Sequence, residues 1–124
     1  MKRLFFLLLV LVSTAFRPAG GPLLQFEELK YNFGFIRQGE VVTHEFSFTN
    51  SGDQPAVITD AEVACKCTTV EFPKTPIAPG AKGTIKVTFD SKSAIDRQER
   101  TVLLKSNGPE VTLTFKCVVL KKKD

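Results

Sequence analysis

The sequence predicts a single all-β domain, a sandwich of about seven strands. Apolar and polar residues alternate in residues 46–49 and again in residues 85–89, which is the period of a strand with one buried face. Turn-forming residues separate such segments, notably residues 50–53 and the Pro79-Gly80 pair. Helical periodicity is absent, and a chain of 124 residues is long enough to bury one core.

The expected strands follow one another along the chain between these turns. An interrupted first strand occupies residues 24–29 and 31–36, with Gly34 as a bulge or a point of close approach. The later strands occupy residues 41–49, 56–64, 65–72, 84–89, 100–106 and 110–120. Ile58 and Val63 have opposite parity, so their strand needs a bulge if both face the core. Residues 93–98 can hold a single helical turn.

The core is expected to consist of the inward-facing apolar residues of these strands, because phenylalanine and branched aliphatic side chains suit the packed faces of a sandwich. The expected core residues are Phe46, Phe48, Ile58, Ile85, Val87, Phe89, Val102, Leu104, Leu113 and Phe115.

The first fifteen residues predict a secretory signal peptide. Lys2 and Arg3 supply a positive start, residues 4–12 form an unbroken apolar run, and small residues follow at 13–15. The apolar run is well short of the roughly 20 residues that a membrane-spanning helix needs. We therefore expect an exported protein in which residues 1–15 are removed and residues 16–23 form a flexible leader, with no transmembrane segment after cleavage.

The charge of the expected sandwich argues against nucleic-acid binding. The chain has 17 Lys and Arg residues and 13 Asp and Glu residues. Leaving out Lys2, Arg3 and the three lysines of residues 121–124 reduces 17 to 12, and leaving out Asp124 reduces 13 to 12. A phosphate-binding protein would carry a clustered basic face, whereas this body is neutral. Residues 121–124 are expected to form a basic, solvated tail that protects the last strand.

The three cysteines are the residues most able to carry chemistry. In an extended strand the Cα atoms of Cys65 and Cys67 would lie about 6.6 Å apart, near the upper limit for a disulfide, so a bond between them would need a turn or would be strained. Export favours oxidation, so one hypothesis is a disulfide from Cys117 to Cys65 or Cys67. Another is a soft-metal site made by Cys65 and Cys67 with His44. The third is that the cysteines are small core residues. Of these three hypotheses we do not favour the metal site, so we expect no bound metal.

The sequence lacks the signatures of an enzyme. Its single histidine, His44, would have to serve any Ser-His-Asp triad, and no Gly-x-Ser-x-Gly elbow accompanies it. Residues 80–84 lack the spacing of a phosphate-binding loop and lead into a strand. We therefore expect no enzyme activity, no catalytic residues and no cofactor.

The sequence resembles a bacterial secreted family known as domain of unknown function 1573, over about residues 26–119. The resemblance is carried by Phe46, Phe48, Asn50 and Gly52, the strand at Ile58, the Cys65-x-Cys67-Thr68 element, the Pro79-Gly80 turn, the Val87-x-Phe89-Asp90 element and the Ser106-Asn107 pair. The family's usual Cys-Gly-Cys-Thr differs here, because Lys66 takes the place of the glycine. The resemblance implies an immunoglobulin-like sandwich over residues 24–120, related to the major-sperm-protein and pilus-chaperone folds. It implies no enzyme activity and no ligand.

Three functional hypotheses follow. The leading one is a non-enzymatic binding or structural module, exported to the periplasm or cell exterior of a Gram-negative bacterium, that meets a protein partner through its loops or an exposed strand edge. The second is a protein that handles thiols or soft metals through Cys65 and Cys67. The third, by analogy of fold alone, is an assembly factor of the pilus-chaperone kind.

Overall fold

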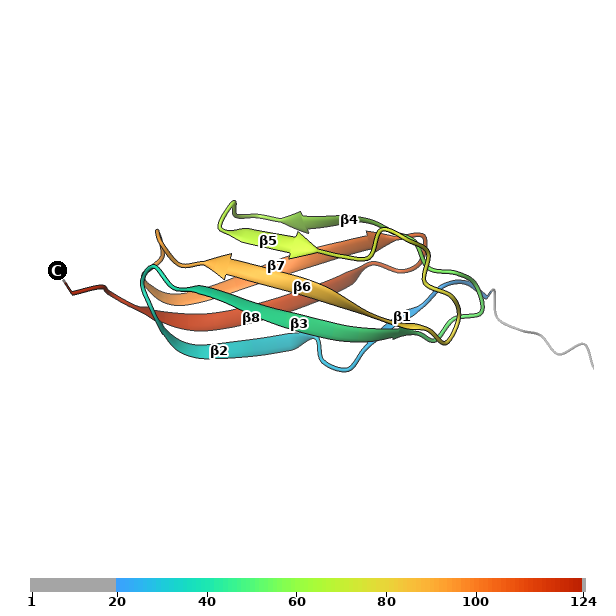
Figure 1. Ribbon diagram of the computed structural model, residues 1–124, viewed down its shortest axis with the longest axis horizontal. Coiled ribbons are helices and arrows are strands. Elements are labelled where there is room, and N and C mark those ends of the chain that lie inside the picture. The colour runs from blue at the N-terminus through green and yellow to red at the C-terminus, as the bar shows by residue number, and fades with distance from the viewer. Residues whose placement is uncertain (1–19, 124) are drawn as a thin grey trace, which may run out of the picture.

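The protein is a sandwich of two four-stranded sheets (Figure 1). The computed structural model describes residues 20–123, so the predicted signal peptide and residues 16–19 of the predicted leader lie outside the described residues. The eight strands are β1 (Leu24–Phe26), β2 (Lys30–Arg37), β3 (Val41–Asn50), β4 (Ile58–Val63), β5 (Thr68–Glu71), β6 (Lys82–Asp90), β7 (Asp96–Ser106) and β8 (Val111–Leu120). The strand orders are β1-β3-β6-β5 and β2-β8-β7-β4. The predicted all-β sandwich is confirmed, with eight strands where about seven were expected.

Alternating side chains from both sheets fill the space between them. All ten predicted core residues are buried, which confirms the assignment of the inward faces. Phe89 in β6 and Phe115 in β8 meet across the sandwich with ring centroids 5.4 Å apart. Fully burying a side chain of this size contributes about 1.5–3 kcal/mol, so the contact between Phe89 and Phe115 is one of those that hold the two sheets together.

The predicted first strand divides between the two sheets. β1 pairs antiparallel with β3, whereas β2 pairs parallel with β8 in the other sheet. Residues 27–29 make the crossing, because the Glu27 N–H donates to the Ser47 carbonyl and the Leu29 carbonyl accepts from the Thr114 N–H. This division accounts for the additional strand.

Both predicted bulges are confirmed. Gly34 has a φ of 75°, and the register of β2 against β8 shifts between Asn32 and Phe35. In β4 the register against β7 shifts between Ile58 and Asp60. The bulge at Gly34 matters for the surface, because it changes which side chains of β2 face inward.

The single helical turn predicted within residues 93–98 is wrong. β7 begins at Asp96, which pairs with Val119 of β8, and the ladder continues without interruption toward Leu104. Pairing with β8 satisfies the backbone of these residues, so a local helical turn does not form.

The connections gather at the two ends of the sandwich (Figure 1). One end carries the β2–β3, β4–β5 and β6–β7 connections together with the end of β8; we call it the C-terminal end. The opposite end carries the β3–β4 and β7–β8 connections and residues 21–23 of the predicted leader. These residues are bonded to the body, since the Leu23 carbonyl accepts from the Ser51 N–H and the Gly21 carbonyl from the Asp53 N–H. No helix in residues 20–123 is long and apolar enough to cross a membrane.

Candidate functional site

A disulfide joins Cys65 and Cys67 in the connection between β4 and β5. The chain turns here, and the Thr68 N–H donates to the Cys65 carbonyl at 3.2 Å. The turn brings the two Cα atoms to 5.2 Å, closer than in an extended strand. The predicted disulfide between Cys117 and one of this pair is therefore wrong, because the turn makes the local bond geometrically possible.

Cys117 is a free thiol in the core of the sandwich. It lies in β8 opposite Gln98 of β7 and is only 3% exposed. Burial raises the pKa of the Cys117 thiol above its ordinary value, and the nearby Arg100 charge opposes that shift without overcoming it. Among the three cysteines, Cys117 therefore fits the hypothesis of a small core residue.

His44 belongs to a different cluster from the cysteine pair. Its ring stacks on Tyr31 of β2 with centroids 3.5 Å apart, and its Nε2 atom bonds to the Glu28 carboxylate. Phe46, its neighbour on the same face of β3, meets the ring edge-on. Within residues 20–123, His44 joins no group of three or more His, Cys, Asp or Glu side chains placed to hold a metal. The structure thus brings Cys65 and Cys67 together but does not bring His44 to them.

The Cys65–Cys67 bond closes too short a loop to hold the fold together. Its residues are two apart in the sequence, and the chain-entropy contribution of so short a loop is about 1.6 kcal/mol, against about 3 kcal/mol for a 15-residue loop. The bond also connects no two strands. Its contribution to stability is therefore smaller than that of a disulfide that joins distant strands.

Replacing both Cys65 and Cys67 with serine should leave the protein folded and lower its free energy of unfolding by no more than about 2 kcal/mol. Urea denaturation of the variant beside the wild-type chain measures the difference. Unfolding of the wild-type chain in dithiothreitol provides a matched measurement without mutation. A variant that fails to fold would show that the bond is structural after all.

A second feature is an apolar cluster on the outer face of the β2/β8 pair, which we call the edge patch (Phe35, Val118 and Leu120). Phe35 is 75% exposed and lies opposite Val118, and Leu120 is 47% exposed. The bulge at Gly34 creates the patch: Phe33 points inward to Phe115, whereas Phe35 points outward. Sequence reasoning identified the bulge but missed this consequence for Phe35.

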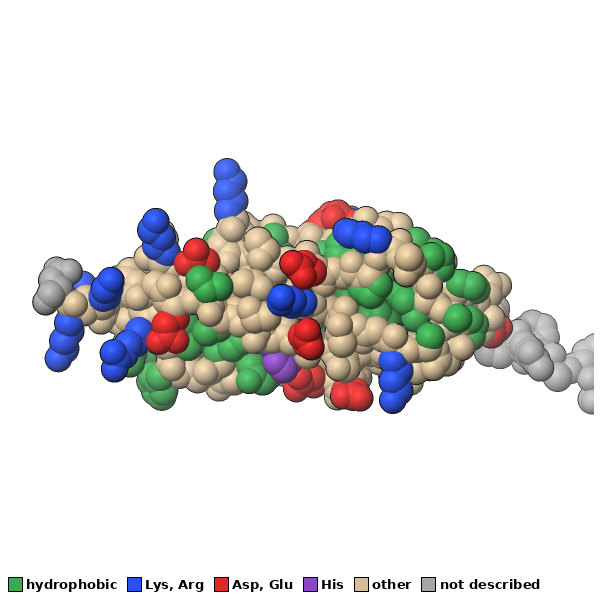
Figure 2. All heavy atoms as spheres, in the orientation of Figure 1, with side chains coloured by type: hydrophobic (Ala, Val, Ile, Leu, Met, Phe, Trp, Pro, Cys, Tyr) green, Lys and Arg blue, Asp and Glu red, His purple; other side chains and the backbone are tan. Residues whose placement is uncertain are grey.

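Positive charge adjoins the edge patch at the C-terminal end, on the side of Leu120. Arg37 and residues 121–123 line a hollow of about 520 Å³ together with Gln38 and Leu120. Gln38 fixes one wall, because its N–H donates to the Leu120 carbonyl and its side-chain oxygen accepts from the Lys122 N–H. Lysine and arginine side chains gather at this end in Figure 2. The surface therefore combines exposed apolar area with an adjoining basic hollow.

The free edge of β2 is partly protected against pairing with another strand. The Gly34 N–H donates to the Asn32 side chain, and the Arg37 N–H donates to the Glu40 carboxylate. Because these donors are already satisfied, a further strand would gain less by adding here.

The fold and its surface define a small immunoglobulin-like β-sandwich. The sequence matches the family described as "Protein of unknown function (DUF1573)" over residues 24–119, and the chain belongs to that family. The resemblance found in the sequence is thereby confirmed. No curated protein matches the chain.

Solved structures share the fold at low sequence identity. A protein of unknown function from Porphyromonas gingivalis W83 matches with a TM-score of 0.71 and 15% identity, covering 84% of this chain and 50% of that one. The PapD-like domain 7 of human CEP192 matches with a TM-score of 0.66 and 8% identity, covering 91% and 95%. The YadV chaperone matches with a TM-score of 0.53 and 11% identity, covering 77% and 51%. The chain thus spans half the length of the Porphyromonas protein, and these likenesses concern the fold alone.

Proposed function

We propose that this protein is an exported, non-enzymatic binding module of the bacterial envelope that recognises a protein partner. The observation that carries the proposal is the edge patch beside the basic hollow. Three apolar side chains on two adjacent strands form a contiguous surface, which is more informative than scattered exposed apolar residues. A binding site of this kind uses the sandwich as a rigid support.

The surface fits a protein segment that carries both apolar side chains and carboxylates. Burying Phe35 against such a segment would remove from water an aromatic ring that is now 75% exposed. The lysines of residues 121–123 and Arg37 would attract the carboxylates, chiefly raising the association rate and making it sensitive to salt. The apolar contact supplies affinity, while the charge selects the partner.

Export and the absence of enzyme activity are supported by separate observations. The N-terminal residues have the charge and apolar pattern of a secretory signal, and a Cys65–Cys67 disulfide suits an oxidising compartment such as the periplasm. His44, the one histidine, is engaged by Tyr31 and Glu28 rather than by a serine or cysteine nucleophile. The likeness to YadV supports a protein partner, but assembly of a pilus does not follow from a match to about half of that chaperone.

A photoreactive amino acid placed at position 35 should cross-link to a partner in the periplasmic fraction of the native bacterium. The control carries the same residue at Lys86, which is exposed on the outer face of β6 in the other sheet. We expect an adduct of defined mass from position 35 and none from position 86. The yield of this adduct should fall as the salt concentration rises, and it should also fall in a variant with residues 121–123 changed to glutamate.

Two results would contradict the proposal. Equal cross-linking from positions 35 and 86 would mean that the edge patch recognises nothing. Recovery of the chain from the cytoplasm, with residues 1–15 still attached in its mass spectrum, would exclude export.

A further inference from the structure

We propose that the Cys65–Cys67 pair is a thiol–disulfide exchange site, with Cys65 as the sulfur that bonds to the substrate and Cys67 as the resolving thiol. The substrate class is an exposed dithiol, or its disulfide, on a peptide or protein. This activity is independent of partner binding through the edge patch. The pair lies beyond β4, at the sheet edge opposite to β2.

The bond can open without disturbing the fold, because the backbone on both sides is held by other bonds. The Cys65 carbonyl accepts from the Thr68 N–H at 3.2 Å, and the Cys67 carbonyl accepts from the Asp90 N–H of β6 at 2.9 Å. These bonds do not involve the sulfur atoms. Both cysteines therefore stay in place after reduction, and re-forming the disulfide requires little reordering of the chain.

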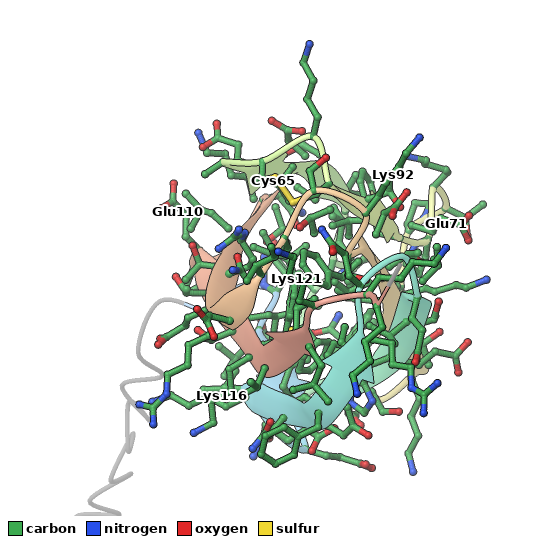
Figure 3. The ribbon with its side chains drawn as sticks, turned by 90° about the vertical axis from the view of Figure 1, so that its left-hand side faces the viewer. Cys65, Glu71, Lys92, Glu110, Lys116 and Lys121 are labelled. Carbon is green, nitrogen blue, oxygen red and sulfur yellow. A yellow bond between two sulfur atoms is a disulfide. The ribbon has the colours of Figure 1, made fainter. Side chains whose placement is uncertain are left out.

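The two sulfur atoms have different surroundings, which assigns their roles. Cys67 packs against the core cluster, and its sulfur lies 3.8 Å from the Thr68 hydroxyl. Cys65 does not belong to the residues packed on that core. In the end-on view of Figure 3, Cys65 lies toward the top, away from the centre of the sandwich. Both cysteines are half-buried, and the looser packing of Cys65 on the core is what assigns it as the sulfur that meets the substrate.

A backbone N–H group also points at the Cys65 sulfur. This sulfur accepts a hydrogen bond from the Cys67 N–H at 3.1 Å, and such a bond favours the negative form of sulfur. Lys66 is exposed between the two cysteines and adds positive charge on the solvent side. A stabilised thiolate serves both as the nucleophile in one direction and as the leaving group in the other.

In the direction that reduces the protein and oxidises the substrate, a thiolate of the substrate dithiol attacks the Cys65 sulfur. The Cys65–Cys67 bond breaks, its electron pair passes to the Cys67 sulfur, and a mixed disulfide joins Cys65 to the substrate. The second substrate thiolate then attacks its own sulfur in that mixed disulfide and expels Cys65 as a thiolate. Two electrons move from the dithiol to the protein, and the two protons released by the substrate neutralise the two cysteine thiolates.

Cys117 takes no part and provides an internal control. It is buried, and its thiol has a raised pKa. A reagent in solution should therefore reach it only after unfolding, since exchange requires an accessible thiolate.

The test compares reduced single variants reacting with glutathione disulfide. The reduced Cys67→Ser variant should gain one glutathione at Cys65, and the reduced Cys65→Ser variant should react at least about tenfold more slowly. The reduced wild-type chain should return to the Cys65–Cys67 disulfide without a lasting adduct. Peptide mapping by mass spectrometry locates each adduct, and circular dichroism verifies that both variants are folded.

Equal rates in the two variants would overturn the assignment of roles, and an adduct at Cys117 in the folded chain would overturn the site itself. A second measurement needs no mutation. Dithiothreitol should open the wild-type disulfide in native buffer, giving two alkylated thiols with an unchanged circular dichroism spectrum. Reduction that occurs only in denaturant would mean that the bond is inaccessible and the proposal wrong.

Discussion

Replacing Phe89 with alanine should lower the free energy of unfolding by about 3–5 kcal/mol, the range expected for a buried aromatic truncated in a packed core. Phe89 is fully buried in β6, its ring lies against Phe115 of the other sheet, and the Arg100 guanidinium lies 5.9 Å from its centroid. Alanine would leave a cavity where the two sheets meet. Since small domains have only about 5–15 kcal/mol of stability, the variant should be marginally folded. Urea denaturation measures the loss.

Phe35→Ala is the matched control for this experiment. The same side chain is removed from a position that is 75% exposed, so stability should change by no more than about 0.5 kcal/mol. A Phe89→Ala variant that unfolds at the same urea midpoint as the wild-type chain would contradict the assignment of the core. A large loss from Phe35→Ala would show that the edge patch stabilises the fold itself.

The inward faces of the sandwich were predictable because alternation is a local property of the sequence. Phe46 and Phe48, for example, alternate with the polar residues Ser47 and Thr49, so the two rings share one face of their strand. The bulge at Gly34 was predictable for a similar reason, since glycine interrupts a strand that otherwise continues. These features depend on a few neighbouring residues and on nothing distant.

The assignment of strands to sheets was not predictable in the same way. Alternation says which face of a strand is buried, but not which of two sheets the strand joins. β1 and β2 have similar patterns and are separated by only three residues, yet they belong to different sheets. The exposure of Phe35 depends on this arrangement, because the parity change at Gly34 acts only once β2 lies beside β8.

The prediction of a disulfide to Cys117 was wrong for a conformational reason. An extended conformation from Cys65 to Cys67 would place the Cα atoms near the upper limit for a disulfide, and the predicted bond to Cys117 rested on that conformation. The backbone bond from Thr68 to Cys65 creates a turn instead. A turn of this kind has no strong sequence signal when Lys66 occupies the position where the family usually has glycine.

Asn50 shows how a residue assigned to a turn can have a larger structural role. It ends β3 and is fully buried. Its side-chain oxygen accepts from the N–H groups of Leu23 and Gly52 at 3.2 and 3.0 Å. Its side-chain nitrogen donates to the carbonyls of Gln54 and Ile77 at 2.8 and 2.9 Å. One amide thus joins three segments that are distant in the sequence or separated by a loop.

Asn50→Ala should therefore lower the free energy of unfolding by about 2–4 kcal/mol, because buried donors and acceptors lose their partners and each costs about 1–3 kcal/mol unless water reaches it. The loss falls mainly on the N–H groups of Leu23 and Gly52, for which alanine offers no substitute acceptor, since the Ile77 carbonyl keeps the bond it accepts from the Ala56 N–H at 2.9 Å. Urea denaturation measures the loss, and Ser51→Ala at the exposed neighbouring position is the control, with an expected change within about 0.5 kcal/mol.

Asn50→Asp separates the hydrogen bonds from the shape of the side chain. The carboxylate can still accept from Leu23 and Gly52, but it presents an oxygen to the Gln54 and Ile77 carbonyls. Burial and those carbonyls should raise the folded-state pKa of the new carboxyl above its unfolded value of about 3.9. The free energy of unfolding that Asn50→Asp loses relative to Asn50→Ala should therefore be small below that unfolded value. This loss should grow as the pH rises through the folded-state pKa. Urea denaturation at pH 3 and pH 7 measures it, and a penalty that does not change with pH would mean that Asn50 is not the buried donor the structure places there.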